Sequence, residues 1–186
     1  MKTKEITLVA LMLAMLIICS QIAIPIGVVP ITLQTFAVLL LGLFLRPRLA
    51  VLTTFLYACM GLVGLPVFSG ASGGPQMIMA PSFGFILGFI PSAWIVSVMS
   101  RQTKHSQLIH NIFACLAGTI MTFVFGVIYF IIIMNGIRQM NMSTLEILGL
   151  TVIPFIPGAI LKMVLALSVH RVLKPVTMKF FEGVKN

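Results

Sequence analysis

The sequence predicts an all-α integral membrane protein, a bundle of six transmembrane helices with both termini on the cytoplasmic side. Of its 186 residues, 60% are hydrophobic and only 8% are charged, whereas a soluble domain carries about 25% charged residues. The mean hydropathy is +1.17. The sequence shows no alternating pattern of a membrane barrel. Its length accommodates one membrane domain, residues 1–186, with about six spans of roughly 20 residues.

Six apolar segments separated by more polar connections are expected to span the bilayer. They cover about residues 6–23, 32–45, 49–65, 83–99, 109–134 and 147–172. The second segment is short, whereas the fifth and sixth are long enough to tilt. Pro154 and Pro157 are expected to break or kink the start of the sixth segment, because proline removes a backbone donor.

The basic residues predict the orientation of these segments. Arg138 falls on one side and Lys162 lies inside the sixth segment, while the other ten basic residues all fall on the opposite side: Lys2, Lys4, Arg46, Arg48, Arg101, Lys104, Arg171, Lys174, Lys179 and Lys185. Basic residues remain cytoplasmic, so both termini are expected inside the cell. The net charge of +9 is divided among several connections, and no nucleic-acid partner is expected.

The ionisable residues exclude several classes of function. Aspartate is absent, and the acidic residues Glu5, Glu146 and Glu182 all lie near span ends. The three histidines are scattered and the three cysteines lie in apolar segments, which favours neither a metal site nor disulfides. The phosphate-binding motif of ATPases is also absent. We therefore expect no enzyme activity, no cofactor and no metal.

Lys162 is the principal candidate for a binding residue. Lys162 lies inside an apolar segment, whereas the other basic residues lie at or between the ends of segments. Its nearest acidic neighbour in the sequence is Glu146. A lysine at membrane depth costs about 2.5–3.5 kcal/mol. A bound anion would offset that cost, which predicts an acidic small molecule as ligand. Snorkelling to the interface or bonding to backbone carbonyls is the alternative.

Two external connections are expected to form the ligand site. The connection at residues 64–84 is long, uncharged and rich in glycine, with apolar residues such as Phe68. We expect its central part, about 66–82, to fold over the helices as a lid, although an ordinary packed connection is the alternative. Thr32 and Gln34 follow the shorter connection. Both can bind a ligand, but Thr32 can equally cap a helix and Gln34 can bond between helices.

Two pairs of small residues predict close contacts of helices. Ala10 and Ala14 are four residues apart in the first segment, and Gly84 and Gly88 have the same spacing in the fourth. Small residues at this spacing allow helices to approach closely. Packing within the bundle is the default interpretation of both pairs.

Several segments in collinear order resemble the BioY family. They are residues 29–34 (VPITLQ), 57–69 (YACMGLVGLPVFS), the glycine pair 73–74, residues 81–89 (PSFGFILGF) and residues 154–162 (PFIPGAILK). The family comprises substrate-binding S components of energy-coupling-factor (ECF) transporters for biotin in prokaryotes. The resemblance implies high-affinity capture of biotin outside the cell, and partnership with a membrane coupling subunit and two ATPases.

The resemblance also implies roles for individual residues. Lys162 matches a lysine that helps to hold the ligand, and Ala10 and Ala14 match the small-residue motif where the coupling subunit docks. The substrate-binding residues implied together are Thr32, Gln34, Phe68, Gly84, Phe85, Ala159 and Lys162.

Two positions depart from the family pattern. Ala159 replaces an aspartate that lies three residues before the lysine, and Phe85 replaces a tyrosine. The aspartate would share a helix face with Lys162. Its loss removes a ligand contact and the resting partner of the lysine. Both changes make the site less polar, so biotin stays the first expectation, with a related acid such as lipoate as an alternative. A membrane scaffold without a ligand is the alternative from another class.

Overall fold

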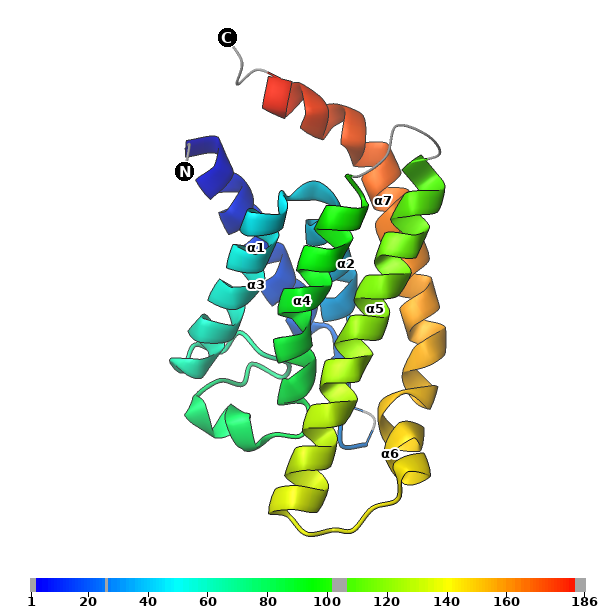
Figure 1. Ribbon diagram of the computed structural model, residues 1–186. Coiled ribbons are helices and arrows are strands. Elements are labelled where there is room, and N and C mark those ends of the chain that lie inside the picture. The colour runs from blue at the N-terminus through cyan, green and yellow to red at the C-terminus, as the bar shows by residue number, and fades with distance from the viewer. Residues whose placement is uncertain (1–2, 26, 102–106, 183–186) are drawn as a thin grey trace.

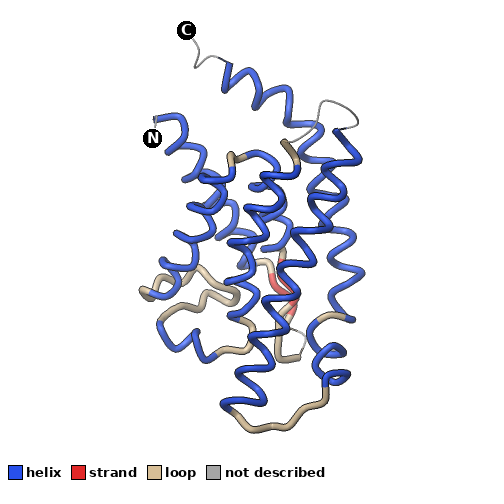
Figure 2. Tube along the Cα trace, in the orientation of Figure 1, coloured by secondary structure: helices blue, strands red, loops and turns tan. Residues whose placement is uncertain are grey.

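The chain folds almost entirely into helices, as the composition predicts (Figures 1 and 2). This computed structural model describes residues 3–25, 27–101 and 107–182, with side chains up to residue 175. The helices are α1 (Thr3–Gln21), α2 (Gln34–Phe44), α3 (Pro47–Leu62), α4 (Phe83–Met99), α5 (Gln107–Ile131), α6 (Thr144–Thr151) and α7 (Ile156–Glu182). An antiparallel pair of short strands, β1 (Ala23–Ile24) and β2 (Ile31–Thr32), joins α1 to α2.

Among the described residues, three helical stretches are long and apolar enough to cross a membrane: Thr3–Gln21, Gln107–Ile137 and Thr144–Pro175. The second of these includes a π-helical turn, η2 (Ile132–Ile137), that continues α5. The helices α2, α3 and α4 are apolar but shorter. Each of the six predicted spans overlaps one of these helical stretches for most of its length. That all six cross the bilayer remains a prediction.

The sixth predicted span is divided near its start, which confirms the prediction from its prolines. Helix α6 ends at Thr151, a 3₁₀ turn η3 (Ile153–Phe155) contains Pro154, and α7 begins at Ile156. Pro157 lies in the first turn of α7, where its missing N–H group is tolerated. After the break, Phe155 of η3 and Ala159 and Lys162 of α7 line a cavity between the helices.

Helices α4 and α5 pack closely through small residues. A Cβ atom at Gly84 would overlap Tyr129, and one at Gly88 would lie 3.0 Å from the Cβ of Phe125. The ring of Phe85 on α4 covers the backbone of Gly126 on α5. The default interpretation of Gly84 and Gly88 as packing residues is therefore confirmed.

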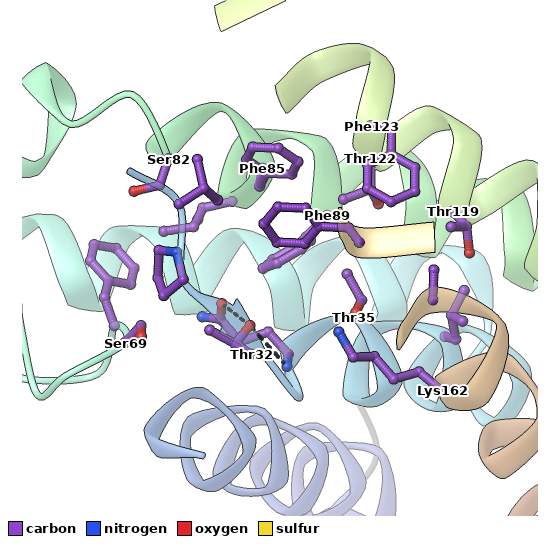
Figure 3. A pocket seen from close by; sticks show the side chains of 18 of the residues that line it. Thr32, Thr35, Ser69, Ser82, Phe85, Phe89, Thr119, Thr122, Phe123 and Lys162 are labelled. Atoms are coloured by element: carbon purple, nitrogen blue, oxygen red, sulfur yellow. Dashed lines mark hydrogen bonds between the residues drawn. The ribbon is translucent and has the colours of Figure 1, made fainter. Parts of the chain in front are cut away.

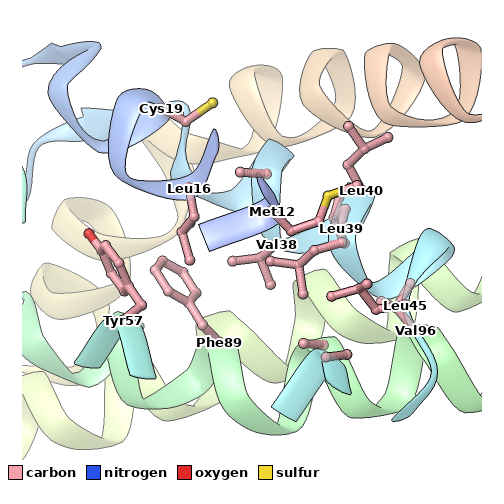
Figure 4. Close-up of a cluster of buried hydrophobic side chains, with 14 of the residues drawn as sticks. Met12, Leu16, Cys19, Val38, Leu39, Leu40, Leu45, Tyr57, Phe89 and Val96 are labelled. Carbon is pink, nitrogen blue, oxygen red and sulfur yellow. The ribbon is translucent and has the colours of Figure 1, made fainter. Parts of the chain in front are cut away.

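Helices α1 to α4 enclose the main hydrophobic core (Figure 4). Leu16 of α1, Val38 of α2, Phe89 of α4 and Val96 of α4 are at most 2% exposed. The buried hydroxyl groups of Thr53 and Thr54 bond to the backbone of their own helix, Thr53 Oγ1 to the carbonyl of Leu49 at 2.8 Å and Thr54 Oγ1 to that of Ala50 at 3.1 Å. This core fixes the relative positions of α2 and α4, which form two sides of the cavity.

The basic connections gather at one end of the molecule, where α1 begins and α7 ends (Figure 1). At this end Arg101 donates to the carbonyl of Phe44 at 2.9 Å and so closes the C-terminus of α2. Glu5 lies 3.8 Å from exposed Arg46. Lys2, Lys104 and Lys185, which belong to the predicted basic side, lie outside the described residues. The connection between α3 and α4 lies at the opposite end (Figure 1).

Candidate ligand-binding site

An open cavity lies between α2, α4, α5 and α7, under the connection between α3 and α4. Its volume is about 110 Å³. The lining residues are Val29, Pro30, Thr32, Gln34, Thr35, Leu39, Phe68, Ser69, Ser72, Met77, Ser82, Phe85, Ile86, Phe89, Thr119, Thr122, Phe123, Phe155, Ala159 and Lys162. This lining contains no acidic residue.

Lys162 extends from α7 into this cavity, and its amine points toward Thr35 (Figure 3). The residue is only 9% exposed. Within the described part of the chain, its amine has no hydrogen-bond or ion-pair partner. This arrangement agrees with a lysine that binds an anionic ligand. It disagrees with snorkelling to the membrane surface, because the side chain is buried in the cavity.

Thr32 and Gln34 line the cavity but are already bonded to protein groups. The Thr32 hydroxyl donates to Gln34 Oε1 at 2.8 Å and accepts from the Gln34 backbone N–H at 3.3 Å. Gln34 Nε2 donates to the Tyr57 hydroxyl at 2.5 Å. Interhelical bonding by Gln34 is therefore present in the structure. Thr32 accepts from the first N–H of α2, but the N-cap position is Leu33.

The connection predicted as a lid, residues 66–82, does fold back over the helices, and we call it the lid loop. Phe68, Ser69, Ser72 and Met77 of this loop line the cavity. The Phe68 ring is fully buried and covers the backbone of Gly61 in α3. The loop is thus packed as well as covering, and its movement remains a prediction.

Hydrogen bonds to backbone carbonyls hold the lid loop in place. The carbonyl of Val67 accepts from Ser20 Oγ at 2.6 Å and from the Tyr57 hydroxyl at 2.9 Å. The Tyr129 hydroxyl donates to the carbonyl of Ile78 at 2.6 Å. Gln21 also donates to the carbonyl of Phe68 at 3.2 Å. These anchors come from α1, α3 and α5.

The glycines of the lid loop serve two different purposes. Gly70 and Gly74 adopt positive φ angles of 70° and 105°, as the sequence predicts for mobile or tightly turned backbone. Gly73 does not, but a Cβ atom there would overlap the carbonyl oxygen of Leu65. Gly73 is therefore required by close packing of two backbone segments.

Aromatic rings form an apolar wall of the cavity. The rings of Phe85 and Phe155 stack with centroids 6.1 Å apart and an interplanar angle of 20°. Phe85 also meets Phe123 edge to face at 6.4 Å. Such a wall accommodates an apolar ring system.

The structure brings together most of the predicted substrate-binding residues. Six of the seven line the cavity: Thr32, Gln34, Phe68, Phe85, Ala159 and Lys162. Gly84 is not among the lining residues, because it faces α5 and packs against Tyr129. The neighbouring residue Phe85 contributes its ring to the aromatic wall of the cavity.

Ala10 and Ala14 are exposed on α1, so the default interpretation that this pair packs within the bundle is wrong for the described part of the chain. The two alanine side chains are small, which would allow another helix to approach α1 closely at these positions. Their predicted contact with a coupling subunit remains a proposal.

Sequence reasoning missed several polar lining residues: Thr35, Ser69, Ser72, Ser82, Thr119 and Thr122. A signal was present for Thr119 and Thr122, since polar residues three apart within an apolar span mark one polar helix face. The sequence gave no such signal for Thr35, because its place in the cavity lining depends on where α2 begins, at Gln34. In residues 3–25, 27–101 and 107–182, no three His, Cys, Asp or Glu side chains come together as metal ligands.

A bundle of apolar helices around a cavity with an aromatic wall and a buried lysine, whose amine has no partner among the described residues, is typical of membrane proteins that bind a small organic acid. Comparison with known proteins gives the family. The model of the BioY family matches residues 1–179. The chain belongs to the BioY family.

Curated relatives support this assignment. The chain is 33% identical to the biotin transporter BioY2 of Lactococcus lactis over 88% of the chain and 86% of that protein. It is 30% identical to the biotin transporter BioY of Rhodobacter capsulatus, with 90% and 92% covered. A probable biotin transporter BioY of Pyrococcus horikoshii is 45% identical over 54% of this chain and 62% of that protein.

A solved structure has the same fold. The crystal structure of the S-component for biotin from an ECF-type ABC transporter matches with a TM-score of 0.77 and 27% identity. The match covers 94% of this chain and 92% of the other. The prediction of a transport protein rather than an enzyme is thereby confirmed, and none of these matches supports the lipoate alternative or the ligand-free scaffold.

Proposed function

We propose that this chain captures biotin at the outer face of a prokaryotic cell membrane, as the substrate-binding S component of an ECF transporter. The observation that carries the proposal is the Lys162 amine, which lies in the cavity without a partner from the described residues. Biotin supplies the missing anion through the carboxylate of its valerate chain. Its fused rings fit the wall formed by Phe85 and Phe155.

The distribution of charge supports the proposed orientation in the membrane. The basic connections lie at the end where α1 begins and α7 ends, while the lid loop lies at the other end (Figure 1). Under the positive-inside rule, the basic end faces the cytoplasm and the lid loop faces outward. The cavity would then receive its ligand from outside.

Transport requires partners that supply energy. The sequence lacks the phosphate loop of ATPases, so we expect two separate ATPase subunits and a membrane coupling subunit. The exposed alanines of α1, Ala10 and Ala14, are the proposed docking face for the coupling subunit. The small side chains at these two positions allow another helix to approach α1 closely there.

Binding of labelled biotin to the purified protein in detergent tests the proposal. We expect the wild type to retain biotin and Lys162→Ala to bind at least tenfold more weakly, about 1.4 kcal/mol. Lys174→Ala is the matched control, because Lys174 lies on the same helix, outside the cavity lining, and bonds to Gln107. Retention by the wild type at the level of protein-free detergent would reject the proposed function.

A further inference from the structure

We propose that the first turn of α2 and the Lys162 ammonium together form the anion-binding end of the cavity, with the Thr35 hydroxyl as a direct ligand contact. This inference rests on the proposed function, because it needs an acidic ligand in the same cavity. It goes further by assigning a second source of positive potential and by fixing which end of the ligand lies there.

The Thr35 side chain provides the first evidence. Its hydroxyl oxygen is buried and has no hydrogen-bond partner among the described residues, although Thr35 lines the cavity. Buried hydroxyl groups are nearly always bonded. Other cavity threonines follow this rule: Thr119 donates to the carbonyl of Cys115 at 2.8 Å and Thr122 to that of Gly118 at 3.1 Å. Ser92 Oγ is also buried without a described partner, but it lies outside the cavity lining. The Thr35 hydroxyl differs because it lies in the lining, where a ligand could accept its hydrogen bond.

The backbone at the start of α2 provides the second evidence. The N–H of Gln34 is bonded to Thr32 Oγ1 and that of Ala37 to the carbonyl of Leu33. For the N–H groups of Thr35 and Phe36, the described part of the chain provides no acceptor. Free N–H groups at a helix start carry a partial positive charge and bind anions.

Lys162 independently indicates an anion at the same place. It is nine-tenths buried, and Figure 3 shows its amine directed toward Thr35. The ammonium and the start of α2 both carry positive charge. Since the cavity lining contains no acidic residue, both would attract a bound carboxylate.

The aromatic wall fixes the direction of the ligand. Phe85 and Phe123 lie across the cavity from the Lys162 amine (Figure 3). An elongated ligand with one charged end then places its carboxylate at Thr35 and Lys162, and its rings against Phe85. The ligand class is a ring system that carries a flexible chain ending in a carboxylate.

The experiment compares biotin with biotinamide, which has nearly the same shape but no charge. Affinities for both are measured by calorimetry on the full chain in detergent. We expect the wild type to prefer biotin, and Thr35→Val to reduce that preference roughly tenfold, the loss expected for one hydrogen bond to a charged group. Thr35→Ser, which keeps the hydroxyl, should retain the preference.

Two further variants separate the contributions. Thr53→Val is the matched control, because the Thr53 hydroxyl is bonded to Leu49 and lies outside the cavity lining; its preference should equal that of the wild type. Lys162→Met should keep a residual preference for biotin over biotinamide, because the start of α2 remains. This measurement decides the question even when Thr35→Val does not fold.

Several outcomes would overturn the inference. They are an unchanged preference in Thr35→Val, no residual preference in Lys162→Met, or equal binding of both compounds by the wild type. Wild-type protein that binds neither compound would instead reject the proposed function, so the two failures are distinguishable.

Discussion

Lys162 places a charge inside the molecule where no described side chain balances it. Such a residue weakens the empty protein and strengthens the complex with an anion, because the same desolvation that penalises the lone ammonium strengthens its attraction to a carboxylate. Stability and ligand binding are thus expected to oppose each other at this position.

Lys162→Met tests this opposition. The variant should raise the melting temperature of the ligand-free protein, because it removes a desolvation penalty of about 2.5–3.5 kcal/mol. Biotin at 100 times its dissociation constant should stabilise the wild type by about 2.7 kcal/mol, and it should stabilise the variant far less. Thermal unfolding in detergent with and without biotin measures both effects, and an equal biotin shift in the two proteins would contradict the assignment.

Ala159 also belongs to the residue scale, because it lines the cavity one helical turn before Lys162. In Ala159→Asp, a carboxylate at this spacing lies on the same helix face and competes for the ammonium. We expect the ratio of affinities for biotin over biotinamide to fall. Ala159→Asn introduces a similar volume without the charge and is the control; a ratio that stays constant in Ala159→Asp would show that the ammonium does not bind the ligand carboxylate.

At the scale of elements, the lid loop depends on how closely it approaches α3. The Phe68 ring occupies the space that a side chain at Gly61 would need, and Phe68 itself lines the cavity. The packing of one helix surface therefore positions a wall of the ligand site.

Gly61→Ala is expected to displace Phe68 and loosen the lid loop. Overpacking of this kind typically costs about 1–3 kcal/mol, and biotin should dissociate faster from the variant. Gly149→Ala in α6 is the matched control, because nothing lies within 4 Å of a Cβ atom there. Dissociation rates by competition with unlabelled biotin provide the measurement, and an unchanged rate in Gly61→Ala would mean that Phe68 does not retain the ligand.

The sequence predicts elements better than it predicts contacts between them. Hydrophobicity locates the helices, and Pro154 marks the break in the sixth segment because proline acts locally. A separate helix α6 was not predicted, although Ser143 and Glu146 form a capping box at its start, a local pattern that an apolar segment conceals. The role of Gly84 could not be separated from that of Phe85, since only the packing of α4 on α5 decides which residue faces the cavity.

At the scale of the whole molecule, the two ends differ in charge and in structure. One end carries the basic connections and the free ends of α1 and α7, and the other carries the lid loop (Figure 1). This difference between the ends agrees with the proposed capture of ligand at the surface that carries the lid loop.

The orientation is expected to show in the labelling of single cysteines. Gly136→Cys, between α5 and α6, should react with an impermeant thiol reagent on intact cells, whereas Arg48→Cys should react only after the membrane is opened. Both positions are exposed, and the natural cysteines Cys19, Cys59 and Cys115 are replaced by alanine in this experiment. Labelling of Arg48→Cys on intact cells would reverse the proposed orientation.

The proposed partner face predicts a separation of binding from transport. Ala10→Phe should leave biotin binding unchanged, because Ala10 faces away from the cavity, but should strongly reduce uptake in cells that contain the partner subunits. Ile128→Phe, at an exposed position of α5, is the control. Normal uptake by Ala10→Phe would place the docking face elsewhere.

The lid loop is held largely through main-chain oxygens, those of Val67, Phe68 and Ile78. These acceptors persist whatever side chain a position carries, provided that the backbone path is kept. Evolution could therefore vary much of the composition of this loop and still preserve its attachment, so ligand selectivity could diverge without a new fold.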